Sequence, residues 1–284
     1  MTFLSFEVHG RALYGCRDAS GQIRQAPADF AARHADLKTV IAAGRLEELR
    51  QAALERGPVV EAAAVRMLPV IPNPGKVFCV GLNYKTHVAE TKRADSEYPS
   101  IFVRFADSLA AHGDLLPRPA FSTRFDFEGE LALIVGKGGR NIAESDALGA
   151  IAGYACFNDV SVRDWQRHTH QWTPGKNFPG TGPLGPALVA RADAPDVNAM
   201  TLTTRLNGQV MQHADVADLI FTIPVIVAYL SRFTPLSPGD VIATGTPGGV
   251  GDRRDPPIYM KEGDVIEVEI TGLGVLRNTV GLAA

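Results

Sequence analysis

One stretch, residues 125–135 with the sequence F-D-F-E-G-E-L-A-L-I-V, constrains the fold of this chain most strongly. In a β-strand, residues i and i+2 share a face, so Glu128 and Glu130 are expected to point in the same direction. Beyond these two glutamates both faces of the strand are apolar, which is typical of a strand that is buried on both sides. The stretch therefore predicts a buried strand that carries two neighbouring carboxylates at its mouth.

The local sequence alone allows two interpretations of this glutamate pair. The pair can be the solvated end of an edge strand, where acidic residues are common. Alternatively, a divalent cation relieves the repulsion between two buried carboxylates, because no Lys or Arg alternates with them. A third carboxylate, Asp159, follows a later apolar run at N-D. An all-oxygen set of this kind suits Mg²⁺ or Mn²⁺, whereas the His and Cys spacings that favour zinc are absent from the sequence.

Composition excludes several classes of protein. The chain has 284 residues with a net charge of -3, and it contains no run of Lys and Arg, so a nucleic-acid-binding surface is not expected. No apolar stretch is long enough to span a bilayer, and the N-terminus lacks the pattern of a signal peptide. Three widely separated cysteines are expected to be reduced thiols in a cytoplasmic protein.

Turn residues, with 28 Gly and 19 Pro, favour a sheet-rich fold. Residues 1–70 predict a small α+β region, with a hairpin over the first twenty or so residues and helical spacing over residues 36–56. A Pro-rich connector leads to a main region, residues 71–284, which is predicted to hold the chemistry. Its expected elements are a strand at 76–81, a short helix with His87 and Glu90 on one face, a charged connection at 91–99, a hairpin from 202, and an apolar helix at 216–233.

Five motifs occur in order: G-L-N-Y-K-T-H-V-A-E, F-E-G-E-L, N-D-V-S-V-R-D-W-Q, G-K-N-F and T-G-T-P-G-G-V-G. Together they resemble the fumarylacetoacetate hydrolase family, in its acylpyruvate hydrolase-like branch, from about residue 76 to the C-terminus. The resemblance implies a β-rich α+β fold of stacked mixed β-sheets with a short lid helix, a homodimer, and a Mg²⁺ or Mn²⁺ centre. The last motif does not match the phosphate-binding G-x-x-x-x-G-K-[ST] pattern, so nucleotide binding is not expected.

The resemblance also implies roles for individual residues. Relatives often carry Lys-Pro where this chain has Arg104 and Phe105, so the far end of the substrate is expected to differ at Arg104, because Arg binds carboxylates in a bidentate manner. The remaining residues match metal ligands (Glu128, Glu130, Asp159), a catalytic dyad on the lid helix (His87, Glu90), a lysine that lines the metal site (Lys176) and groups that hold the substrate's carboxylate or oxo oxygens (Gln166, Thr246).

The leading functional hypothesis is a metal-dependent hydrolase that cleaves a C–C bond in a fumarylpyruvate- or acylpyruvate-like diketo acid, as in the breakdown of aromatic compounds. His87 would take a proton from water while Glu90 orients its ring. The alternative is a decarboxylase or keto–enol isomerase, of the type that acts on 5-carboxymethyl-2-hydroxymuconate or 5-oxopent-3-ene-1,2,5-tricarboxylate, with the same metal site. A third possibility, from a different class, is a keto-acid-binding protein without activity. The sequence does not identify the substrate.

Several other polar residues have weaker interpretations. Arg163 and Asp164 are expected to form an ion pair or to support the site from behind. His168 and His170 share a face of an extended loop, which makes them candidates for substrate specificity. His112 and His213 are expected to be surface or hydrogen-bonded polar positions.

Overall fold

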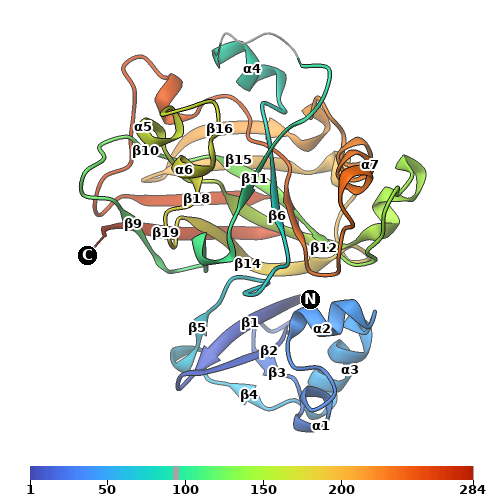
Figure 1. The fold of residues 1–284 in the computed structure, drawn as a ribbon. Coiled ribbons are helices and arrows are strands. Elements are labelled where there is room, and N and C mark those ends of the chain that lie inside the picture. Colours follow the sequence, from blue (N-terminus) through green and yellow to red (C-terminus); the bar gives the residue numbers. More distant parts are fainter. Residues whose placement is uncertain (92–95, 284) are drawn as a thin grey trace.

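The computed structural model describes residues 1–91 and 96–283 (Figure 1). Residues 92–95, in the charged connection expected at 91–99, lie outside the described residues. Within the described part of the chain, no helix has the length and apolar character needed to cross a bilayer. The predicted β-rich α+β fold is confirmed, since strands in two large mixed sheets form most of the ordered structure.

The larger sheet contains twelve strands and is built around β11 (Gly129–Val135). All seven residues of β11 are buried, as expected for a strand covered on both faces. β11 pairs with β12 (Ile151–Asn158) on one side and with β17 (Val241–Ala243) on the other. The sheet continues beyond β12 with β14 (Gly182–Ala190), and beyond β17 with β6 (Val77–Gly81) and β7 (Ser100–Arg104).

The predicted single strand over 125–135 is wrong in one respect, because it is broken into β10 (Phe125–Asp126) and β11. β10 pairs with β13 (Ser161–Val162), whereas β11 pairs with β12. At the break, the backbone N–H of Glu128 donates to the side-chain oxygen of Asn158, 3.0 Å away. The interruption places Glu128 at the rim of the larger sheet.

A second sheet of five strands packs on one face of the first. Its strands are β16 (Gln209–Asp215), β15 (Thr201–Leu206), β18 (Val265–Ile270), β19 (Gly274–Leu282) and β9 (Leu115–Arg118). Leu131 and Leu133 of β11 share a buried core with Leu202 and Val268 of this sheet. The hairpin predicted from residue 202 is confirmed as β15 and β16.

The helix predicted over 216–233 begins later than expected. Residues Val216–Asp218 form a 3₁₀ turn, and α7 covers Ile223–Phe233, with Pro224 in its first turn. Between the two, Leu219 forms an isolated β-bridge with Tyr84, which holds this segment extended. Pro at the start of a helix is well tolerated because the first N–H groups have no partner within the helix.

The N-terminal region continues the larger sheet. Its strands are β1 (Thr2–Val8), β2 (Arg11–Arg17), β3 (Ile23–Gln25), β4 (Val59–Val60) and β5 (Arg66–Met67), and its helices are α1 (Ala28–Ala31), α2 (Leu37–Ala42) and α3 (Leu46–Arg56). β1 lies beside β14, with Phe3 opposite Leu188. Side chains of α2 and α3 share a core with Ala132 and Ile134, on the face of β11 opposite to the second sheet.

The short elements gather near the mouth of β11. They are α4 (Lys85–Thr91), α5 (Arg163–Gln166), α6 (Thr173–Lys176) and β8 (Leu109–Ala110). In Figure 1, α4 lies at one end of the molecule and the N-terminal elements, drawn in blue, lie at the other. The N-terminal region is therefore far from the helix that carries His87.

Candidate metal centre and cavity

Three carboxylates predicted from the sequence converge at the mouth of β11. Glu128, Glu130 and Asp159 each offer an oxygen, and these oxygens lie within 4.8 Å of one another. The pairing of β11 with β12, with Gly129 opposite Asn158, brings Glu130 and Asp159 together. All three side chains are buried. They form a candidate divalent-metal site composed of oxygen ligands, the kind that Mg²⁺ and Mn²⁺ prefer.

The electrostatic environment of the Glu130 carboxylate indicates whether these three residues fit a bound cation. Burial, together with the neighbouring carboxylates of Asp159 and Glu128, raises the pKa of Glu130 well above its usual range. Among the described residues, the one hydrogen bond that its carboxylate accepts is from the N–H of Gly245, at 2.8 Å. The Lys176 ammonium lowers this pKa only in part. A buried carboxylate with a single neutral hydrogen-bond donor and two anionic neighbours remains costly unless a further cation joins it. The donor set therefore fits a divalent metal ion.

Glu128 has the opposite electrostatic environment. Burial acts to raise its pKa, but the Lys176 ammonium and the Arg163 guanidinium together hold the pKa of Glu128 below its usual range. Nζ of Lys176 lies 2.8 Å from Oε2 of Glu128 and 2.5 Å from Oδ2 of Asp159. Lys176 thus lies beside the candidate metal site.

Arg163 pairs with Asp126 and Glu128, and its expected pairing with Asp164 is not found. Its Nε donates to Oδ2 of Asp126 at 2.8 Å, and its Nη1 lies 2.5 Å from Oε1 of Glu128. Asp164 instead accepts from the Ser122 hydroxyl. Arg163 therefore contacts the candidate metal site through Glu128, which is the position that the alternative expectation, support from behind the site, requires.

Asp126 is a buried residue that the sequence reasoning overlooked. Besides Arg163, it accepts the backbone N–H groups of Gly251 and Asp252, at 2.9 and 3.0 Å. Burial raises its pKa. The signal was present in the sequence, because Asp126 precedes Glu128 by two residues, but the strand pattern did not show that its carboxylate faces inward.

Arg104, expected at the far end of the substrate, lies behind the metal centre. Its Nη1 donates to Oδ1 of Asp159 at 2.6 Å, and its Nη2 donates to Oγ1 of Thr181 at 2.8 Å. Nε donates to Ser108. The guanidinium is buried and does not belong to the described lining of the cavity. The placement expected for Arg104 is thereby corrected.

His87 and Glu90 lie on α4, as predicted. Nδ1 of His87 lies 2.7 Å from Oε1 of Glu90, and the other carboxylate oxygen of Glu90 accepts the N–H of Gly249 at 2.8 Å. The hydroxyl of Thr86 accepts the N–H of Gly248. These contacts fasten α4 to the Gly-rich loop at 244–251, and they account for the presence of both motifs in one chain.

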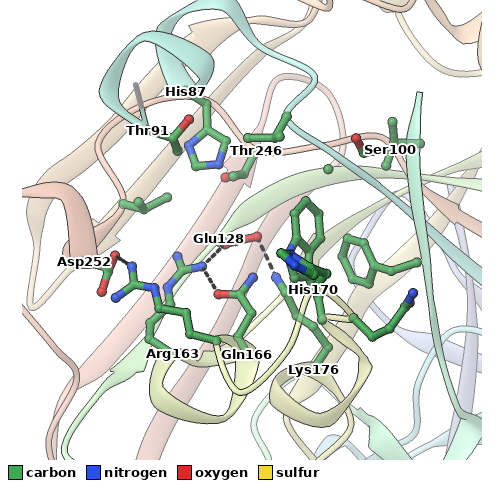
Figure 2. Close-up of a pocket in the computed structure, with 18 of the residues that line it drawn as sticks. His87, Thr91, Ser100, Glu128, Arg163, Gln166, His170, Lys176, Thr246 and Asp252 are labelled. Atoms are coloured by element: carbon green, nitrogen blue, oxygen red, sulfur yellow. Dashed lines mark hydrogen bonds and ion pairs between the residues drawn. The ribbon is translucent and has the colours of Figure 1, made fainter. Parts of the chain in front are cut away.

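A cavity of about 600 Å³ opens between α4 and the carboxylates. Figure 2 shows His87 on one side with its ring directed toward Glu128, and Lys176, Gln166 and Arg163 on the other side. Gln166 accepts a hydrogen bond from Arg163 at 3.0 Å. This volume lies within the range that small-molecule sites occupy, about 300–1,000 Å³.

Thr246 and His170 also line the cavity. The hydroxyl of Thr246 donates to the carbonyl of Gly129 and accepts from Gln212, so this part of the loop is tied directly to β11. His170 is exposed at the opening, whereas the His168 ring packs against Trp165.

Two further histidines, His112 and His213, form hydrogen bonds outside the cavity. Nδ1 of His112 accepts the N–H of Arg277, and His213 bonds the hydroxyl of Thr203. Both agree with the polar positions expected from the sequence.

The sequence and the fold were compared with known proteins. The family model described as Fumarylacetoacetate (FAA) hydrolase C-terminal matches residues 76–281. The human protein "Oxaloacetate tautomerase FAHD2A, mitochondrial" is 40% identical over 237 residues, which are 83% of this chain and 76% of that protein.

Solved structures match the whole chain. The structure of fumarylacetoacetate hydrolase from psychrophilic Exiguobacterium antarcticum superimposes with a TM-score of 0.87 at 35% identity, covering 99% of each chain. That of maleylpyruvate hydrolase from Sphingobium sp. SYK-6 gives a TM-score of 0.82 at 26% identity, covering 100% of each. The stacked-sheet fold predicted from the motifs is confirmed by these matches.

Proposed function

Because this chain belongs to the fumarylacetoacetate hydrolase family, and is thus an enzyme that acts on small oxo acids, we propose that it catalyses keto–enol tautomerisation of a small 2-oxo acid such as oxaloacetate. Support comes from the similarity to a human oxaloacetate tautomerase. The proposal thus prefers keto–enol isomerisation, which was part of the alternative expected from the sequence, to C–C bond hydrolysis, which was the leading hypothesis. The observation that carries the proposal is the His87–Glu90 pair, whose imidazole lies across the cavity from Glu128, one of the three clustered carboxylates.

Tautomerisation requires one base and a means to hold the enolate. A Mg²⁺ or Mn²⁺ ion held by Glu128, Glu130 and Asp159 would polarise the 2-oxo group and so acidify the neighbouring C–H bond. Glu90 accepts at Nδ1 of His87, which assigns the proton to Nδ1 and leaves Nε2 free to act as the base.

In this scheme Nε2 of His87 takes a proton from C3, and a proton is returned to the oxygen at C2, so that the keto form becomes the enol. The reverse sequence converts enol to keto, and no water is consumed. The Lys176 ammonium lies beside two of the metal-ligating carboxylates and would stabilise the negative charge that develops on the substrate. Closure of α4 over the cavity would exclude competing water.

A second candidate is hydrolysis of a C–C bond in an acylpyruvate, the leading hypothesis from the sequence. Two observations favour it. The cavity of about 600 Å³ offers room for a diketo acid and a water molecule. The fold is also similar over its full length to a maleylpyruvate hydrolase. Here His87 would take the proton from water instead of from C3, with the same groups around it.

One pair of assays separates the two activities. The first follows the enol absorbance of oxaloacetate, and the second follows the loss of diketone absorbance of acetylpyruvate, each with Mg²⁺, with Mn²⁺ and with EDTA. Metal-dependent acceleration of the first, without formation of pyruvate and acetate in the second, supports the tautomerase. Formation of pyruvate and acetate supports the hydrolase. No effect in either assay would contradict both.

Two further expectations are carried forward as proposals. We propose that the enzyme is a homodimer, on the basis of the family resemblance, and light scattering of the purified chain tests this. We also propose a cytoplasmic location, on the basis of the three cysteines, all of them buried free thiols in the structure.

A further inference from the structure

The positively charged side chains around the cavity differ in how completely they are paired with carboxylates of the protein. Lys176 is paired with Glu128 and Asp159, and Arg163 is paired with Asp126 and Glu128. Each of these two cations therefore already has two carboxylate partners.

Arg167 and Arg253 line the cavity further from the metal centre. Arg167 forms a close ion pair with Asp252. Arg253 reaches the same carboxylate only at 3.5 Å, and it has no other polar partner within the described part of the chain. Arg253 thus has guanidinium N–H groups that remain available to a ligand, and one carboxylate is shared between two arginines. This wall of the cavity carries an excess of one positive charge.

The backbone on both sides of Arg253 is held in place. Gly251 and Asp252 donate their N–H groups to the buried Asp126, and the hydroxyl of Tyr259 donates to Asp252 at 2.9 Å. On the other side, Nε of Arg254 donates to the carbonyl of Gly249. A side chain that starts from a fixed backbone loses less freedom when it binds a ligand, so the position is partly preorganised.

The exposure of Arg253 suits a binding group at a cavity opening. Its side chain is 34% exposed, so it can reach a ligand while its charge is only partly screened by solvent. A guanidinium binds a carboxylate through two parallel N–H groups. We propose that Arg253 is a specificity-determining residue that binds the second carboxylate of the substrate, remote from the 2-oxo group. The site would then prefer dicarboxylic 2-oxo acids to those with a neutral far end.

This inference rests on the proposed function, and its test uses two substrates of similar size. Oxaloacetate ends in a carboxylate where acetylpyruvate ends in an acetyl group. In the Arg253→Gln variant of the full-length enzyme with Mg²⁺, we expect KM for oxaloacetate to rise about tenfold, while KM for acetylpyruvate changes less than about twofold and kcat for either is little changed. Arg253→Lys should give an intermediate KM for oxaloacetate.

The matched control is Arg205→Gln. Arg205 has a similar exposure of 29% and pairs with Glu269 on the second sheet, outside the cavity lining. The Arg205→Gln substitution removes the same charge as Arg253→Gln and should leave the KM values for both substrates unchanged. Equal changes for the two substrates in Arg253→Gln, or no change, would overturn the inference.

If the unmodified enzyme turns over neither compound, the proposed function fails, and Arg253 is then tested by binding alone. Calorimetric titration of the enzyme and its Arg253→Gln variant with oxaloacetate, in the presence of Mg²⁺, should show about tenfold weaker binding to the variant. Equal affinities would overturn the role of Arg253 independently of catalysis.

Discussion

Nη1 of Arg104 lies 2.6 Å from Oδ1 of Asp159, and neither side chain has any exposed surface. The remaining donors of the guanidinium bond Thr181, Ser108 and the carbonyl of Val160. This arginine holds Asp159, a candidate metal ligand, from behind, so any effect of Arg104 on the substrate is expected to pass through Asp159.

Arg104→Lys should therefore weaken the metal centre more than substrate binding. A lysine cannot reproduce the forked contacts to Asp159 and Thr181. We expect affinity for Mn²⁺ to fall about 10–100-fold, with KM at saturating metal changed far less. Titration of Mn²⁺ by electron paramagnetic resonance measures the first quantity. A large rise in KM with unchanged metal affinity would instead place Arg104 at the substrate.

Glu130→Gln should abolish metal binding without unfolding the chain. Because two neighbouring carboxylates and burial disfavour a charge at Glu130, the neutral amide should leave the metal-free protein as stable or more stable. Thermal unfolding in EDTA and Mn²⁺ titration test the two parts. Glu269→Gln, on the exposed side of β18, is the control. A loss of stability in EDTA would contradict this account of the site.

His87→Ala should remove turnover while the metal stays bound. His87 is the base in the proposed scheme and makes no hydrogen bond to a metal-ligating carboxylate in the structure. We expect kcat to fall about 10²–10⁴-fold, with Mn²⁺ affinity unchanged. Glu90→Gln should give a smaller loss of kcat, because the ring remains but its orientation is less well fixed. An active His87→Ala enzyme would exclude both the tautomerase and the hydrolase mechanisms given above.

Metal affinity should increase with pH. The raised pKa of Glu130 favours its protonated form in the metal-free site, and a divalent cation competes with that proton. Lowering the pH favours the protonated, metal-free state, so affinity should weaken as pH falls. Calorimetric titration in two buffers of different ionisation enthalpy will show proton release on binding. Binding without proton release at neutral pH would mean that Glu130 is already ionised in the metal-free protein.

Asp126→Asn should affect both the metal centre and the lid. Asp126 joins Arg163, which contacts Glu128, to the Gly251 backbone in the loop that also contacts Glu90. Loss of its charge leaves the buried Arg163 with less compensation, and we expect about 1–3 kcal/mol of lost stability together with a reduced kcat. Denaturant unfolding and steady-state kinetics measure these effects. If the unfolding free energy and kcat are both unchanged in Asp126→Asn, the contacts of Asp126 with Arg163 and Gly251 do not stabilise the site.

The ordered motifs allowed much of the molecule to be predicted. The alternation around Glu128 and Glu130 indicated a buried strand with clustered carboxylates, and the spacing of His87 and Glu90 indicated a shared helix face. Both follow from local periodicity, which a sequence displays directly. The structure brings Glu128, Glu130 and Asp159 together, and Figure 2 shows His87 across the cavity from Glu128.

Hydrogen-bond and ion-pair partners that lie far apart in the sequence could not be predicted in the same way. The break before β11 depends on the side chain of Asn158, and the partner of Arg163 is Asp126 instead of the adjacent Asp164. Whether Arg104 faces the substrate or Asp159 is likewise decided by the pairing of β7 with β6 in the larger sheet, where Arg104 lies opposite Val77. Such choices depend on tertiary contacts, which no local pattern records.

The loop at 245–252 serves the site mainly through its main chain. Its N–H groups bond Glu130 from Gly245, Glu90 from Gly249, and Asp126 from both Gly251 and Asp252. A change of side chain leaves these amides in place, whereas the deletion or insertion of one residue would shift them all out of register. Natural variants and engineered libraries of this enzyme should therefore tolerate substitutions at the non-glycine positions of the loop far better than any change in its length, whereas a side chain at Gly251 would collide with the carbonyl oxygen of Ile258.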